Sequence, residues 1–84
     1  MSAEKFVFKA TAFKHGISEA DIRKAFECCL FDHVLQGEEQ KNLLIGLNRN
    51  GFPIEIIYNV LEDETINVFH AMECRKAYLD LLYF

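Results

Sequence analysis

The sequence predicts a single α+β domain with two N-terminal helices, an antiparallel meander of three or four strands and a C-terminal helix. Three changes of pattern carry this prediction. A helix start signal occurs near residue 18, apolar residues alternate with a period of two between residues 43 and 70, and helical spacing returns from residue 71. With 84 residues the chain has room for one hydrophobic core, so residues 1–84 are expected to form one domain.

The first predicted helix covers residues 3–14. Phe6, Ala10 and Phe13 recur at helical spacing, whereas Phe6 and Phe8 could equally alternate along a strand. Gly16 is expected to end this element, because glycine readily adopts the left-handed conformation found at helix ends. We expect a helix, and a strand stays open as the alternative.

The second predicted helix, at about residues 19–29, has the clearest start. Ser18 fits the N-cap position with Asp21 three residues later, and Ile17 can pack against Ile22. Apolar residues then recur at i, i+3, i+4 and i+7 and should form one buried face: Ile22, Ala25, Phe26 and Cys29.

The meander is predicted around a hairpin. Residues 31–35 are a candidate edge strand, and the alternation that starts at Leu43 leads into the turn sequence Asn48-Arg49-Asn50-Gly51. Pro53 then marks the start of the return strand, since proline is tolerated at a strand start or edge. In this strand one face is expected to lie in the core, formed by Ile54, Ile56, Tyr58 and Val60.

The last strand and the last helix follow an acidic turn at residues 62–65. The strand is predicted at residues 66–70, with Ile66, Val68 and His70 on one side. From Ala71 the spacing is helical, and the expected apolar stripe of this C-terminal helix is Ala71, Cys74, Tyr78, Leu81 and Leu82.

The charge of the chain limits how it can contact nucleic acid. The net charge is −4 and the pI is about 5.2, which excludes binding through bulk electrostatics and leaves only a local basic patch. The bases concentrate near the two ends of the chain: Lys9, Lys14, Arg23, Lys24, Arg75 and Lys76. A chain of this size is marginally stable alone, so we expect a complex, either a homodimer or a hetero-oligomer.

The cysteine and hydropathy patterns predict no metal, no cofactor and no membrane span. Cys28, Cys29 and Cys74 are expected to be reduced core thiols, and neither a Cys-x-x-Cys nor a His-x-x-x-His spacing for zinc is present. No stretch approaches the roughly 20 apolar residues of a span, and the N-terminus lacks a secretory signal core. We therefore expect a cytoplasmic protein.

No common catalytic motif is present, but some residue types suit phosphodiester chemistry. Histidine transfers protons near neutral pH, and arginine or lysine stabilises charge on a phosphate. The candidates are Lys14, His15, Arg49, His70, Arg75, Lys76 and Tyr78. His70 and Arg75 are expected to face one cleft where the last strand meets the last helix. The alternative is that these residues have structural roles alone. His70 would then form hydrogen bonds with nearby backbone groups, Arg75 would be solvated, and His15 would interact with the dipole of a helix C-terminus.

These residues also resemble a known family. The segment Lys14-His15-Gly16-Ile17-Ser18 opening a helix, the meander, and Val68-Phe69-His70-Ala71-Met72 leading to Arg75, Lys76 and Tyr78 resemble the BrnT-type toxins of bacterial type II toxin–antitoxin systems. The likeness covers residues 8–82 in order of elements. It implies a RelE-like ribonuclease fold, a cognate antitoxin as partner, and metal-independent endoribonuclease activity on RNA.

The resemblance also implies roles for individual residues. Arg75 would stabilise the scissile phosphate and His70 or His15 would move protons, while Lys14, Lys76 and Tyr78 would bind RNA. Where BrnT-type sequences have a Ser-Ala-Arg step, this chain has His70-Ala71-Met72, and its charge is acidic rather than basic. The alternative is therefore a non-catalytic protein-binding module, or an inactive toxin relative that works through a partner.

Overall fold

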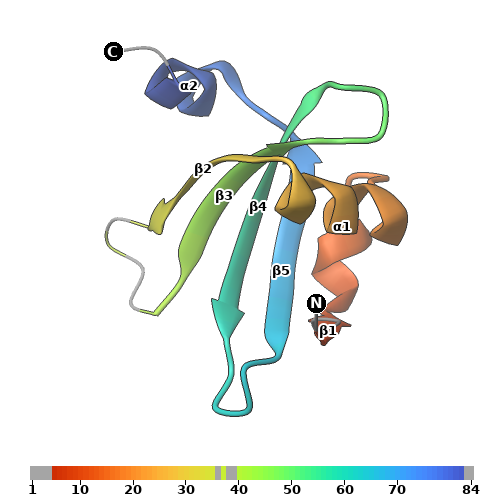
Figure 1. Cartoon of the computed structure of the whole chain (residues 1–84), viewed down its shortest axis with the longest axis vertical. Helices are drawn as coiled ribbons and strands as arrows, with labels where there is room; N and C mark the ends of the chain where they lie inside the picture. The colour runs from red at the N-terminus through yellow and green to blue at the C-terminus, as the bar shows by residue number, and fades with distance from the viewer. Residues whose placement is uncertain (1–4, 36, 38–39, 83–84) are drawn as a thin grey trace.

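The computed structural model describes residues 5–35, 37 and 40–82. It shows an α+β fold built on a twisted sheet (Figure 1). The elements in chain order are strand β1 (Phe6–Phe8), the 3₁₀ turn η1 (Ala10–Phe13), helix α1 (Glu19–Glu27), strands β2 (Cys29–Val34), β3 (Asn42–Leu47), β4 (Pro53–Val60) and β5 (Ile66–Glu73), helix α2 (Lys76–Leu79) and the 3₁₀ turn η2 (Asp80–Leu82).

The sheet has five strands in the order β1-β5-β4-β3-β2 and is mixed. The pairs from β2 to β5 are antiparallel, whereas β1 lies parallel to β5, with Phe6 opposite Ile66 and Phe8 opposite Val68. The predicted RelE-like arrangement of two N-terminal helices, a three- or four-stranded meander and a C-terminal helix is therefore wrong.

The error at the N-terminus has a tertiary cause. Residues 6–8 form a strand, which is the alternative that the alternation of Phe6 and Phe8 left open, and only residues 10–13 are helical, as a 3₁₀ turn. Pairing with β5 satisfies the backbone of β1, and the Phe6 ring packs edge-on against the Phe26 ring of α1 at 5.2 Å between centroids. This burial outweighs the helical spacing of Phe6, Ala10 and Phe13, because local propensity is a weak determinant beside tertiary packing.

Helix α1 begins as predicted. The backbone N–H of Asp21 donates to Ser18 Oγ at 3.1 Å, and Ile22 and Ala25 are buried. The helix ends at Glu27, so Cys29 begins β2 instead of completing the helical stripe. Gly16, just before the helix, has φ +82°, which is the left-handed conformation expected for it.

The helix packs directly on the backbone of β3. A Cβ atom at Gly46 would collide with the main chain of Ala25, so only glycine lets the two elements approach this closely. We call this side of the sheet the helix face. Its pairing register places Leu44, Ile56 and Ala71 on this face, and all three are buried.

The predicted hairpin is confirmed. The N–H of Asn48 donates to the carbonyl of Phe52 at 2.8 Å, and Pro53 is the first residue of β4, opposite Leu47. Strand β2 lies at the edge of the sheet, as expected for residues 31–35. Ile54, Ile56 and Tyr58 are buried as predicted, whereas Val60 is 54% exposed.

Strand β5 contains an irregularity that the sequence did not predict. His70 pairs with Ile57 and Val68 pairs with Tyr58, so Phe69 is an extra residue in β5. The bulge turns His70 to the side opposite Val68, and the expectation that Ile66, Val68 and His70 share one side is wrong. We call the side that carries His70 the site face.

Strand β5 also runs further than predicted. It continues to Glu73, and Ala71 lies buried in it opposite Ile56. The last helix therefore starts at Lys76 and not at Ala71, and it is short. The predicted stripe that began with Ala71 and Cys74 is not a helix face, because pairing with β4 keeps these residues extended.

Candidate functional site

The centre of the site face is a buried carboxylate, Glu55 of β4, whose residue is 0% exposed. Its oxygens accept hydrogen bonds from the backbone N–H of Arg75 at 3.0 Å, from Arg75 Nη2 at 2.7 Å and from Arg75 Nε at 3.2 Å. His70 Nε2 lies 3.0 Å from Glu55 Oε2. Two of the predicted site residues are therefore held by one acid.

The Glu55 carboxyl is ionised at neutral pH. Burial by itself raises the pKa of Glu55, but hydrogen bonds from the side chain and backbone of Arg75 and from His70 outweigh it, and the pKa lies below the ordinary value. The same interaction, led by the hydrogen bond to Glu55, raises the pKa of Arg75. Glu55 and Arg75 thus form a charged pair, and Glu55 also bonds an imidazole.

The second histidine comes from another part of the chain. The rings of His15 and His70 lie edge to face with 5.4 Å between their centroids. His15 follows η1, which is fixed to β5 by two bonds: the Thr11 hydroxyl donates to the Phe69 carbonyl at 2.6 Å, and the N–H of Lys9 donates to the Val68 carbonyl at 2.9 Å. The bulge therefore both turns His70 onto the site face and supplies the carbonyl that anchors the segment before His15.

The hydrogen bond to Glu55 sets the tautomer of His70. An ionised carboxylate only accepts hydrogen bonds, so Nε2 of His70 must carry the proton in this contact. In the neutral ring Nδ1 is then the unprotonated nitrogen. A carboxylate that fixes the tautomer of an imidazole in this way prepares its other nitrogen to accept a proton.

Arg75 connects the cluster to the C-terminal helix. It occupies the N-cap position of α2, and its guanidinium carbon lies 5.2 Å from the centroid of the Tyr78 ring. The Arg75 side chain is 54% exposed, so part of it faces solvent although Nε and Nη2 bind Glu55. Next to it, burial and then the charge of Glu55 raise the pKa of Cys74 to about 11, so this thiol is protonated at neutral pH and unsuited to act as a nucleophile.

The structure thus brings together four of the sequence-predicted residues: His15, His70, Arg75 and Tyr78. Lys14 is exposed beside His15 in the chain. Lys76 is 89% exposed and forms an ion pair with Asp80 at 3.6 Å. The last of the candidates, Arg49, binds Asp21 of α1 through its N–H at 3.0 Å and its Nε at 2.9 Å, so it anchors the β3–β4 turn to α1.

Sequence reasoning missed Glu55. The alternation of β4 placed this residue with Ile57 and Asn59 on the face opposite the predicted core, where an acid needs no explanation. The signal that could have found it is weak: Glu55 is the one acid among the strand residues 53–60. Only the bulge and the start of α2 bring His70 and Arg75 to it.

No group of three or more His, Cys, Asp or Glu residues among the described residues could hold a metal ion. None of the helices within the described part of the chain is long and apolar enough to cross a membrane.

Comparisons of this chain with protein-family models, with curated proteins and with solved structures found no significant match. The resemblance to BrnT-type toxins stays a prediction from sequence.

Proposed function

We propose that this chain is a metal-independent endoribonuclease, the toxin component of a toxin–antitoxin pair. The observation that supports this best is the cluster on the site face. His70 and Arg75 bind the buried, ionised Glu55 carboxylate, and the His15 ring packs against His70. Proton transfer and phosphate stabilisation are the two tasks that RNA cleavage without a metal requires.

The proposed step is an internal transesterification. Nδ1 of His70 accepts the proton of a ribose 2′-hydroxyl, and the 2′-oxygen forms a bond to the adjacent phosphorus while the bond from phosphorus to O5′ breaks. His15, protonated, gives its proton to the departing O5′. The products are a 2′,3′-cyclic phosphate and a 5′-hydroxyl, so atoms and charge balance without an external reactant.

Arg75 would stabilise the charge that develops on the phosphate. A guanidinium has five N–H donors, and the Glu55 contacts use those of Nε and one on Nη2, so outward-facing donors remain on a side chain that is half exposed. Lys14 and Lys76 are exposed and would contact the RNA backbone, with Tyr78 placed beside Arg75. This local set of positive groups would bind RNA despite a net charge of −4.

One observation favours a second function, that of a non-catalytic binding module. The Glu55–Arg75 pair joins the middle of the sheet to the start of α2, which is what a purely structural ion pair would do. In that case the cluster fixes the C-terminal helix, and the protein acts through a partner. This candidate predicts a complex and no cleavage.

Cleavage of a labelled single-stranded RNA by the purified chain, with and without EDTA, separates the two functions. The proposal expects cleavage in both conditions, a cyclic phosphate on the product by mass spectrometry, and no cleavage of RNA with 2′-deoxyribose at the cut position. His70→Ala and Arg75→Ala should each lower the rate by about 10²-fold or more. An activity that survives both substitutions, or that stops in EDTA, contradicts the proposal.

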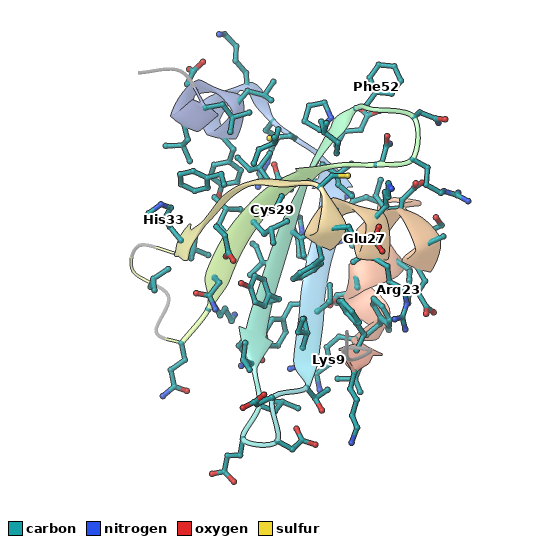
Figure 2. All side chains as sticks on the ribbon, viewed as in Figure 1. Lys9, Arg23, Glu27, Cys29, His33 and Phe52 are labelled. Atoms are coloured by element: carbon teal, nitrogen blue, oxygen red, sulfur yellow. The ribbon has the colours of Figure 1, made fainter. Side chains whose placement is uncertain are left out.

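His33→Ala is the matched control for this experiment. His33 is an exposed histidine on β2, at the opposite edge of the sheet from β1 (Figure 2). It shares a row of the site face with His70 but is separated from it by three strand spacings, about 14 Å. Its loss should leave the rate unchanged, because it does not contact the cluster around Glu55.

A further inference from the structure

The helix face contains a groove that the proposed ribonuclease site does not use. It lies between the C-terminal end of α1 and the β4–β5 turn, and has a volume of about 550 Å³. Its lining comes from α1, all strands from β2 to β5 and the β4–β5 turn: Phe26, Cys29, Asp32, Leu44, Tyr58, Val60, Glu64 and Ile66. A volume of this size falls within the range of protein ligand sites.

One part of the groove lining is apolar. Leu44, Tyr58 and Ile66 are at most 7% exposed and form part of the wall, while Val60 is 54% exposed. Leu61, the residue that follows β4, does not line the groove and is 41% exposed.

The rim of the groove is acidic. Asp32 and Glu64 line it, and the Tyr58 hydroxyl donates to both carboxylate oxygens of Asp32 at 2.7 and 2.9 Å, which fixes the position of that charge. Asp63 stands in the same turn as Glu64, and hydrogen bonds from Thr65 lower the pKa of Asp63 so that it is charged at neutral pH.

One base, Lys5, acts on an acid of this turn. Its coulombic effect on the pKa of Asp63 is smaller than that of the hydrogen bonds from Thr65. The chain as a whole carries a net charge of −4. The groove therefore combines apolar lining residues with acidic residues that attract positive charge.

We propose that this groove binds a cationic amphipathic segment of a partner protein. An apolar side chain of the segment lies on Leu44 and Ile66, and lysine or arginine side chains beside it meet Asp32 and Glu64. This inference does not rest on the ribonuclease proposal, since the register places the groove on the helix face and Glu55 on the site face. A partner in the groove would therefore lie on the side of the sheet opposite Glu55.

The test uses the full chain and two 14-residue amphipathic probe peptides. One peptide has leucines on one helical face and lysines on the other, and the second has glutamates in place of the lysines. Fluorescence anisotropy gives the affinity, and amide chemical shifts of the ¹⁵N-labelled chain give the location. We expect the lysine peptide alone to bind, with shifts concentrated at residue 32 and residues 58–66.

Substitutions then separate the contributions of charge and of apolar contact to the binding of the lysine peptide. Asp32→Asn and Glu64→Gln should each weaken binding of the lysine peptide about two- to five-fold, while Glu73→Gln, an equal charge change at the other end of the helix face, should not. Val60→Ser should weaken it about three- to ten-fold, while Val34→Ser, an exposed valine of β2 outside the groove, should not.

Four results of the peptide-binding experiments would overturn the inference. These are equal binding of the glutamate peptide, shifts centred on another surface, affinities that the groove substitutions do not change, or no binding of the lysine peptide at 1 mM. Sedimentation of the chain alone is a further check, because a dimer that Val60→Ser dissociates would mean that a second copy, and not a different protein, occupies the groove.

Discussion

The most informative single change in this protein is Glu55→Gln. It keeps the shape of a fully buried side chain but removes the charge that binds Arg75 and His70. Removing one partner of a buried charged pair costs about 3–5 kcal/mol when the other charge stays buried. Here the Arg75 side chain is 54% exposed and can be hydrated again, so we expect a smaller loss of about 2 kcal/mol, chiefly from unmatched donors around the new amide.

Urea unfolding followed by circular dichroism measures this loss. For a domain of this size about 2 kcal/mol corresponds to a fall in Tm of about 8–16 °C. Glu27→Gln is the control, because Glu27 is an exposed acid whose side chain is 71% accessible. Its unfolding free energy should equal that of the unchanged chain within error, and the m-value should be the same in all three proteins.

The pH dependence of the difference in unfolding free energy between the unchanged chain and Glu55→Gln shows whether the charge of Glu55 causes it. The pKa of Glu55 is lowered in the folded protein, so its charge stabilises the fold at pH values above the ordinary pKa of glutamate. This stabilisation is lost as the pH falls through the lower, folded pKa. The difference in unfolding free energy between the unchanged chain and Glu55→Gln should therefore be largest near pH 7 and decrease in acid. A difference below about 0.5 kcal/mol at pH 7, or one that does not change with pH, would refute the account of Glu55 as an ionised centre.

Three further predictions concern the scaffold and the site. Gly46→Ala should destabilise the fold by about 3 kcal/mol or more in urea unfolding, because the added Cβ meets the main chain of Ala25; a cost below about 1 kcal/mol would show that α1 can move away freely. Ser18→Ala should cost about 1 kcal/mol in the same assay through loss of the N-cap bond, and an unchanged midpoint would mean that this bond is replaced by water. His15→Ala should lower RNA cleavage by about 10²-fold with little change in unfolding, because His15 is exposed, while His33→Ala changes neither; equal rates for the two variants would remove His15 from the proposed mechanism.

The parts of the fold that the sequence predicted correctly depend on local chemistry. The N-cap of α1 at Ser18 and the β3–β4 turn with Pro53 at the strand start are determined by residues a few positions apart. At residues 6–8 a helix was expected and a strand was only the open alternative, because the stability of this strand comes from pairing with β5, sixty residues later in the chain. A short segment with both helical and alternating spacing takes the form that its distant partner allows.

The candidate site also has a part that the sequence predicted and a part that only the tertiary structure shows. Residue type alone pointed to His15, His70 and Arg75, because imidazole and guanidinium suit phosphodiester chemistry. It did not identify Glu55, which holds two of the three. Alternation placed Glu55 on the solvent side of a strand, and the continuation of β5 to Glu73 moved the start of α2 to Lys76.

By itself the sequence determined the α+β composition, the start of α1, the β3–β4 hairpin and the chemical types of the site residues. The tertiary structure decided the mixed sheet, the side of the sheet on which His70 lies and the burial of Glu55. The mixed sheet depends on the pairing of β1 with β5. The side of His70 depends on the bulge at Phe69, whose one extra residue reverses the facing of every later side chain in β5. Such a shift of register depends on how β5 packs against β4 and η1. The spacing of residues within β5 carries no information about that packing.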